Sequence, residues 1–420
     1  VEYSDLLKRP LDAWRYLLLA IETGELMLPM SNLPIDSVLL ASSNELHLRA
    51  FQEHPEYQSF RGRLMPLRVA YLRDYVQEQG IYDAQIVPQV RSHVAPHTTY
   101  VAGLWAILTR LRRARPERFE QVELGRLAGD LTPLEKADLY ATAKVPRRFD
   151  EEEAKVLAGG IRDIFDEPSG TLDYEGLIGA SPREMRMLLL EAASDPGEAC
   201  LSPASLLDRI ETFCERDDYA FLRTETDRGY HDARAFARIA RERWLDLVDD
   251  ELRTATGLVD QNQYRELFDR YVTHVSHALE KEQVLSPITG KHVDPDEDLM
   301  ESVESMLGAK DADTFRRELM SRVAAWAIDH PDQSVDYELL FPRFIERLEE
   351  AYYNEHAKRI AELGRDVLRL LEGETLPIAD NEAATATRAR LEAFGYVEAS
   401  LRVALGALLK ARYPQGQVGR

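Results

Sequence analysis

Cysteine is scarce in this chain, which has only Cys200 and Cys214 among its 420 residues. Two cysteines cannot frame a disulfide-rich fold, and they suit a reducing cytosol. No apolar run approaches the length of a membrane span, and no signal peptide is evident at the start. We therefore expect a soluble cytoplasmic protein that has no membrane partner.

Basic charge is also in deficit. The sequence has 52 Lys and Arg residues against 74 Asp and Glu residues, a formal net charge of −22. Contacts from Lys and Arg to phosphates supply most of the affinity of duplex-binding proteins, so we expect no nucleic-acid partner. One basic cluster, Arg110-Leu111-Arg112-Arg113-Ala114-Arg115, could form a local patch. We interpret it as the solvated end of a helix.

Several catalytic signatures are missing. There is no G-x-x-x-x-G-K-[ST] loop, because the Gly290-Lys291 pair is followed by His292 in a loop-like stretch. The H-R-D-x-x-x-x-N and D-F-G signatures of protein kinases are absent, as is the G-x-S-x-G elbow of many hydrolases. We expect that the chain as given does not bind ATP tightly.

The residues that are present favour a mainly α fold. Hydrophobic residues make up 45% of the chain, which is ample for a core, and the length of 420 residues suggests two or three domains. A first helix is predicted over 71–81, and Thr98 is a candidate N-cap for an apolar helix over 100–111. A small hairpin or loop is expected near 284–296. Further apolar spacings of three and four predict helices over 205–213, 232–255, 261–282, 313–328, 336–369 and 385–411.

Paired histidines could suggest a metal site. His93 and His97 are four residues apart and His274 and His277 are three apart. Pro96 prevents a regular helical pair in the first case, and neither pair has further ligands clustered nearby. We expect no metal site of this chain's own.

One short apolar run is followed by polar residues. Residues 37–41 (SVLLA) predict a strand that is buried on both faces of a parallel sheet. Asn44 would lie just past its carboxyl end, where open α/β sheets bind ligands. Arg63 precedes a second predicted short strand over 64–69, and from there it could reach a neighbouring subunit's phosphate. A turn asparagine and a surface arginine are the alternative interpretation.

Taken together, several blocks resemble the bacterial PrkA serine protein kinase family, which joins an AAA+ core to a C-terminal PrkA domain. LLASSNE and FRGRL are similar to the sensor-1 strand and the arginine-finger region of AAA+ ATPases. The similarity extends to about residue 413, although it is patchy over 112–170 and 305–390. The blocks that carry it are VEYSDLLKRPLDAWRYLLLAIETGEL, LPIDSVLLASSNE, HVAPHT, GASPREMRMLL and YRELFDRYVTHVSHALEKEQVLSPITGKHVDPDEDLMESVE.

The resemblance implies roles for three residues. Asn44 would be sensor 1, and Arg63 would be a finger that acts in trans, which implies self-association into a ring or head-to-tail oligomer. Ser181 is a natural N-cap and Pro182 fits the first position of a helix that ends near Ala193. Arg183 in its first turn would be sensor 2, contacting the γ-phosphate in the same subunit. The alternative for Arg183 is capping, or pairing with Glu184 or Asp173.

The resemblance also implies an architecture and an activity. We expect the C-terminal part of an AAA+ α/β core over 1–70, a helical lid over 71–200 and a helical PrkA domain over 201–420. The chain is similar to a fragment that begins after Walker B, so ATP and Mg²⁺ would be bound mainly by upstream residues and the fragment alone would be inactive. The implied function is an ATP-dependent serine protein kinase of bacterial stress or sporulation signalling that acts on protein substrates. The alternative is an AAA+ remodelling ATPase or ATP-dependent protease.

Overall fold

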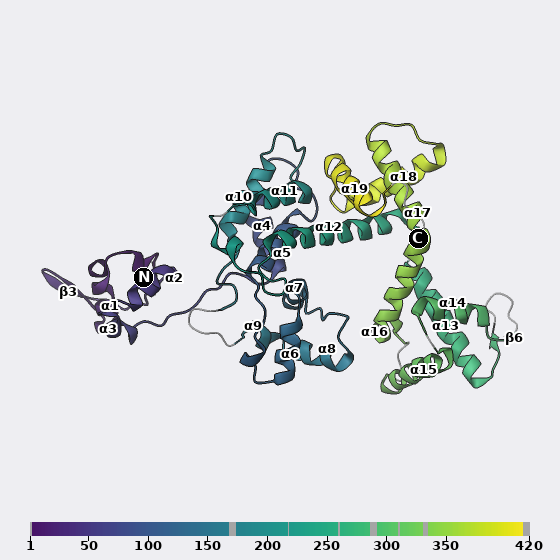
Figure 1. Cartoon of the computed structure of the whole chain (residues 1–420), viewed down its shortest axis with the longest axis horizontal. Helices are drawn as coiled ribbons and strands as arrows, with labels where there is room; N and C mark the ends of the chain where they lie inside the picture. The colour runs from purple at the N-terminus through teal and green to yellow at the C-terminus, as the bar shows by residue number, and fades with distance from the viewer. Residues whose placement is uncertain are drawn as a thin grey trace. The chain divides into compact units, whose positions relative to one another are not determined.

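The computed structural model describes residues 2–167, 174–216, 218–258, 261–285, 292–309, 311–330 and 335–414. The chain divides into two compact units, Val1–Val69 and Ala70–Arg420, which are described separately below. Helices dominate and the described strands are all short, so the predicted mainly α class is confirmed (Figure 1). Among the described residues, none of the helices combines the length and the apolar content that crossing a bilayer requires.

The first unit is built on a small aromatic core. Trp14, Phe51 and Phe60 are buried together with Leu6, and the Trp14 and Phe51 rings meet edge to face at 5.5 Å. The elements around this core are β1 (Glu2–Tyr3), η1 (Leu6–Lys8), η2 (Leu11–Ala13), α1 (Arg15–Thr23), β2 (Glu25–Leu28), β3 (Ser31–Pro34), β4 (Leu40–Ala41), α2 (Glu45–Gln52) and α3 (Tyr57–Arg61). β1 pairs with β4 in parallel, and β2 pairs with β3 as an antiparallel hairpin.

Two strand predictions in this unit are wrong. The strand predicted over 37–41 is reduced to β4, and Leu40 is 67% exposed. Among the described residues β4 pairs with β1 alone, so no further strand or helix layer buries it on both faces. The segment 64–69 forms no sheet ladder, and Met65 and Val69 are 85% and 91% exposed. Pro66 removes a backbone donor there, which weakens any strand pairing.

The second unit has a main core that draws on both ends of the unit. α5 (Thr98–Arg110) is buried along almost its whole length, and Gly103 lets it approach the backbone of α4 (Tyr75–Gln85). The core also takes side chains from α10 (Pro182–Ala193), α11 (Pro203–Phe213), α12 (Ala233–Thr256), α18 (Ile378–Ala393) and α19 (Glu398–Arg412). Residues from the predicted lid and from the predicted C-terminal domain thus share one core. The predicted domain boundaries stay a prediction.

Two smaller cores flank the main one. The first lies between η4 (Pro116–Arg118), α6 (Val122–Asp130), α7 (Pro133–Thr142), α8 (Glu151–Gly159) and α9 (Ile161–Phe165). The second lies between α13 (Gln261–Glu280), α14 (Glu297–Leu307), α15 (Ala312–Asp329), α16 (Tyr337–Leu340) and the first half of α17 (Pro342–Leu371). The long helix α17 therefore joins the second small core to the main core (Figure 1).

Most helices predicted beyond residue 200 are confirmed, with two differences. The helix predicted over 336–369 is interrupted at Phe341, and Pro342 begins α17 because proline is accepted at a first helical position. The helix predicted over 385–411 is interrupted between α18 and α19, where Gly395 has φ +94°. The hairpin expected near 284–296 is confirmed as β5 (Val284–Leu285) paired with β6 (His292–Val293), and residues 286–291 lie outside the described residues. The remaining short helices are η3 (Val87–Gln89) and η5 (Ala220–Arg223).

Candidate functional site

Asn44 is the N-cap residue of α2. Its Oδ1 accepts a hydrogen bond of 2.9 Å from the backbone N–H of His47, which satisfies one free donor of the first helical turn. The side chain is exposed, and its Nδ2 donates to none of the described residues. The amide nitrogen is therefore the part of Asn44 that remains available to a ligand. The role as sensor 1 stays a prediction.

Arg63 lies two residues after α3 in the first unit. Its Nε is 2.8 Å from Oε2 of Glu22, its Nη2 donates to Oε1 of the same carboxylate, and its Nη1 donates to the carbonyl of Ser59. The side chains of Arg63 and Glu22 are 43% and 47% exposed. Exposed ion pairs contribute little free energy, so a phosphate could displace Glu22 at small cost. The role as a finger stays a prediction.

Arg183 stands in the first turn of α10, and the local structure follows the sequence. Ser181 is the N-cap, Pro182 is the first helical residue and the helix ends at Ala193, all as predicted. Glu184 completes a capping box, because its Oε2 accepts a 2.6 Å hydrogen bond from the backbone N–H of Ser181. Arg183 is exposed and forms no hydrogen bond or ion pair with any described residue, and Asp173 lies outside the described residues. Its guanidinium is thus held on a capped helix end with its donors available.

Arg110, at the end of α5, holds the N-terminus of α10 in place. The interpretation of the 110–115 cluster as a solvated helix end is wrong for this residue, which is 1% exposed. Its Nε donates to the carbonyl of Ala180 at 2.8 Å, and Nη1 and Nη2 bind both oxygens of Glu78 in α4 at 2.8 and 2.7 Å. The backbone N–H of Ala180 donates in turn to Oγ1 of Thr109 at 2.9 Å. The approach to α10 is therefore pinned to both α4 and α5.

The close contact between the end of α5 and the residues just before α10 depends on Gly179. Its φ of +131° is a conformation that residues with a side chain rarely adopt, and a Cβ there would lie 2.5 Å from Cγ of Arg110.

Tyr82 is a third member of the buried Arg110–Glu78 network, since its hydroxyl donates to Oε1 of Glu78 at 2.6 Å. Burial and the adjacent Glu78 charge raise the pKa of the Tyr82 phenol, so it remains a donor.

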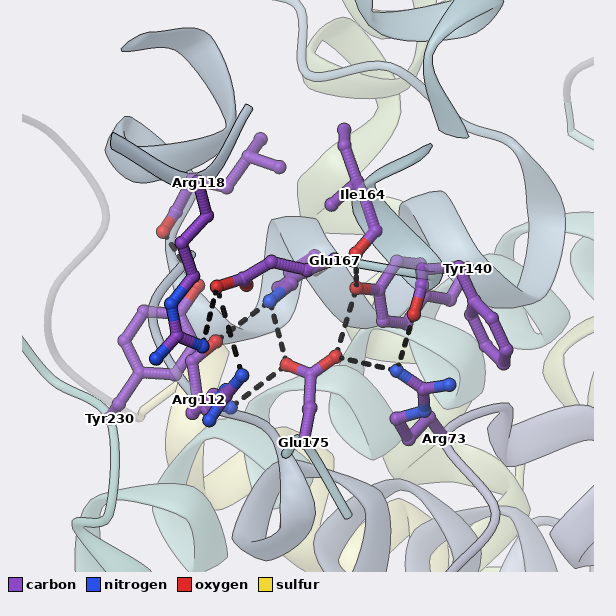
Figure 2. A network of polar contacts seen from close by, with 11 residues as sticks. Arg73, Arg112, Arg118, Tyr140, Ile164, Glu167, Glu175 and Tyr230 are labelled. Atoms are coloured by element: carbon purple, nitrogen blue, oxygen red, sulfur yellow. Dashed lines mark hydrogen bonds and ion pairs between the residues drawn. The ribbon is translucent and has the colours of Figure 1, made fainter. Parts of the chain in front are cut away.

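A second buried network fixes the loop that precedes α10 (Figure 2). Oε1 of Glu175 accepts hydrogen bonds from Nζ of Lys136 at 2.6 Å and from the backbone N–H of Arg112 at 3.0 Å. Its Oε2 accepts from the Tyr140 hydroxyl at 2.9 Å and from Nη1 of Arg73 at 3.2 Å. Burial alone would raise the pKa of the Glu175 carboxyl, but the Lys136 charge and these hydrogen bonds hold it below its ordinary value. Glu175 is thus a charged anchor, shown between Arg73 and Arg112 in Figure 2.

These two networks are the part of the site that the sequence did not reveal. The local sequence carries no signal for them, because Lys136 stands in α7 between Glu135 and Asp138, as a surface lysine would, and yet it is fully buried. Within the described ranges no group of three or more His, Cys, Asp or Glu side chains is placed to hold a metal ion. His97 instead pairs with Glu251 at 2.8 Å, and His93 lies 3.2 Å from Oγ of Ser400.

Comparison with known proteins shows which family this chain belongs to. The family model of the PrkA AAA domain matches residues 1–118, which include Asn44 and Arg63, and that of the PrkA serine protein kinase C-terminal domain matches residues 134–406, which include Arg183. Two curated relatives are the ATP-dependent protease PrkA of Bacillus subtilis (strain 168) and the serine/threonine kinase YeaG of Escherichia coli (strain K12).

The relatives are similar at modest identity. The first is 25% identical over 299 residues, which cover 70% of this chain and 42% of the relative. The second is 23% identical over 332 residues, which cover 77% of this chain and 47% of the relative. The chain thus spans less than half the length of the curated relatives it matches, and no solved structure matches it. Because the C-terminal domain model alone matches more than half of its residues, the chain belongs to the PrkA family.

Proposed function

We propose that this chain works within an ATP-dependent serine protein kinase, acting on cytoplasmic protein substrates in bacterial stress or sporulation signalling. The observation that carries the proposal is Arg183, a guanidinium without a described partner on the capped N-terminus of α10. The match to the PrkA AAA domain, whose family is ATP-dependent, supports ATP as the phosphoryl donor. Mg²⁺ would be bound mainly outside the described residues, since these contain no group of ligands for it.

Arg183 would act in cis as sensor 2. A helix N-terminus favours negative charge, and a planar guanidinium fork matches the oxygens of a phosphate. Phosphoryl transfer depends mainly on positioning and on stabilising charge that develops on the transferred group. The buried Arg110–Glu78 pair supports this role, because it fixes the backbone of Ala180 three residues before Arg183.

Asn44 and Arg63 would be the functional residues of the first unit. Asn44 would position water or a substrate hydroxyl near the γ-phosphate, with its amide nitrogen free for that contact. Arg63 would leave Glu22 and reach the nucleotide of a neighbouring subunit, which requires a ring or head-to-tail oligomer. An Arg63→Ala change in the complete protein should then lower turnover and spare nucleotide binding. Unchanged turnover, or a monomeric sedimentation mass with nucleotide present, would contradict this part of the proposal.

The test is incubation of the complete protein with γ-labelled ATP and a generic acceptor protein, followed for both free phosphate and protein-bound label. Arg183→Ala should abolish label on serine, because the γ-phosphate loses a charged contact. Arg186→Ala is the matched control, since Arg186 lies one turn further along α10 and is exposed, with Gln89 as its partner at 2.7 Å. Serine label that persists in Arg183→Ala would overturn the role of Arg183.

A second candidate is an AAA+ remodelling ATPase or an ATP-dependent protease. Two observations favour it: the Bacillus subtilis relative carries the name ATP-dependent protease, and the sequence has no H-R-D-x-x-x-x-N or D-F-G signature. In the same experiment, free phosphate without protein-bound label would select this candidate. ATP-dependent cleavage of the acceptor protein would then separate a protease from a remodelling enzyme.

A further inference from the structure

We propose that Thr109, in the last turn of α5, is a positioning residue for Arg183. This role rests on the proposed function, in which Arg183 contacts the γ-phosphate, and it names the residue that sets where that guanidinium stands. Thr109 is 3% exposed, and its Oγ1 accepts the 2.9 Å hydrogen bond from the backbone N–H of Ala180. Ala180 immediately precedes Ser181, the N-cap of α10, and lies three residues before Arg183.

The hydroxyl of Thr109 is held in the orientation of an acceptor. It donates its own proton to the carbonyl of Ala106 at 2.6 Å, within α5, so the lone pairs of the oxygen remain for the N–H of Ala180. Because α5 is buried along almost its whole length, the oxygen has a fixed support. Thr109 therefore presents a fixed acceptor to the segment that leads into α10.

The contacts at Ala180 differ in kind from those along the body of α10. The buried residues of the helix are apolar, and apolar packing is non-directional; they are Met185, Leu188, Leu189 and Ala192. At Ala180 both backbone groups have a buried partner instead, the N–H in Oγ1 of Thr109 and the carbonyl in Nε of Arg110. Two hydrogen bonds at one residue fix the direction in which the backbone enters α10. Of the two partners, Thr109 can be changed without leaving a buried charge unpaired.

The direction of the first turn of α10 decides where Arg183 can reach. Arg183 is exposed and no described residue holds its guanidinium, so its place depends on the backbone that carries it. Groups that act on a bound ligand must be held within about 0.5 Å of their productive geometry. Without the Thr109 hydroxyl, the buried N–H of Ala180 loses its acceptor, and the backbone must shift to find another. We therefore expect a loss of affinity for ATP that spares ADP, which has no γ-phosphate for Arg183 to contact.

The test is equilibrium titration of the complete protein with ATP and with ADP. Thr109→Val keeps the shape of the side chain and removes the hydroxyl; it should weaken ATP binding about threefold and leave ADP binding unchanged, since one neutral hydrogen bond is worth a factor of this order. Thr109→Ser keeps the acceptor and should bind ATP as the wild type does.

Thr387→Val is the matched control. Thr387 is 1% exposed in α18 and donates to the carbonyl of Ala383 at 2.9 Å, as Thr109 donates within α5, but it accepts no hydrogen bond from any described residue. It thus removes a buried helical hydroxyl that holds no second segment, and both affinities should stay unchanged. A loss of ATP affinity in Thr387→Val equal to that in Thr109→Val would overturn the role of Thr109.

A double variant separates positioning from a general loss of structure. If Thr109 acts through Arg183, Thr109→Val should cost no further ATP affinity in an Arg183→Ala background. Additive losses in the double variant, an equal loss for ATP and ADP in Thr109→Val, or full ATP affinity in Thr109→Val while Arg183→Ala loses it, would overturn the role of Thr109 alone. No ATP-specific loss in Arg183→Ala would instead overturn the proposed function of Arg183, and the role of Thr109 with it. If Thr109→Val fails to fold, Thr109→Ala removes the same oxygen from a smaller side chain and is judged by the same outcomes.

Discussion

Replacing Arg110 by methionine should destabilise the second unit more than any surface change. The Arg110 and Glu78 side chains are 0% and 1% exposed, and the substitution removes both hydrogen bonds to the Glu78 carboxylate. Glu78 would keep the Tyr82 hydroxyl as its hydrogen-bond partner among the described side chains. Breaking a buried ion pair by removing one partner costs about 3–5 kcal/mol, because the other charge stays buried without compensation. We expect a loss of that size in the free energy of unfolding.

The assay is urea unfolding followed by far-UV circular dichroism, with the free energy taken from the midpoint and slope. The matched control removes all three side-chain groups in the triple variant Arg110→Met, Glu78→Leu, Tyr82→Phe, which leaves neither charge of this pair nor an unpaired hydroxyl; as in Arg110→Met alone, the carbonyls of Ala180 and Leu72 lose the Arg110 donors. Apolar replacement of a complete buried pair is often neutral, so this variant should recover more than half of the loss. A loss below about 1 kcal/mol in Arg110→Met, or no recovery in the triple variant, would refute the reasoning.

Two further predictions concern the loop before α10. Gly179→Ala should cost about 3 kcal/mol of stability in thermal melts, because its Cβ would lie 2.5 Å from Cγ of Arg110 at a φ of +131°. The control is Gly406→Ala in α19, where a Cβ meets no atom within 4 Å. It should be neutral or stabilising in the same melts. The pKa of Glu175 is lower in the folded state than in the unfolded state, so the unfolded state binds more protons in acid. The stability that this carboxylate contributes is therefore lost as the pH falls from the ordinary glutamate pKa of about 4.3 through the folded-state pKa. Glu175→Gln should therefore show a shallower acid limb, by up to about 1.4 kcal/mol per pH unit, in urea unfolding between about pH 5 and pH 3, and an unchanged limb would contradict this.

The helices could be predicted because their signals are local. Ser181 and Pro182 mark the start of α10 by cap chemistry that involves only the next few residues. The same holds for the apolar spacing of α12 and for the hairpin near 284–296. Burial could not be predicted in the same way. Residues 37–41 have the composition of a buried strand, but burial requires neighbouring layers that the described residues do not place around β4.

The buried charges could not be predicted from local sequence either. A run such as 110–115 is typical of a solvated surface, and the partner of Arg110 lies 32 residues away in α4. Lys136 and Glu175 are 39 residues apart and become partners only after α7 and the loop before α10 have packed. The sequence located Arg183 on its helix, whereas the residues that fix that helix emerged from the tertiary fold.

The most direct test of the role of Arg183 is the affinity of the complete protein for ATP and for ADP, measured by equilibrium titration for wild type, Arg183→Ala and Arg186→Ala. If Arg183 contacts the γ-phosphate, Arg183→Ala should weaken ATP binding about tenfold and leave ADP binding unchanged, since ADP lacks that group. Arg186→Ala should change neither affinity. Equal affinities of wild type and Arg183→Ala for ATP, or an equal loss for ATP and ADP, would contradict a contact between Arg183 and the γ-phosphate.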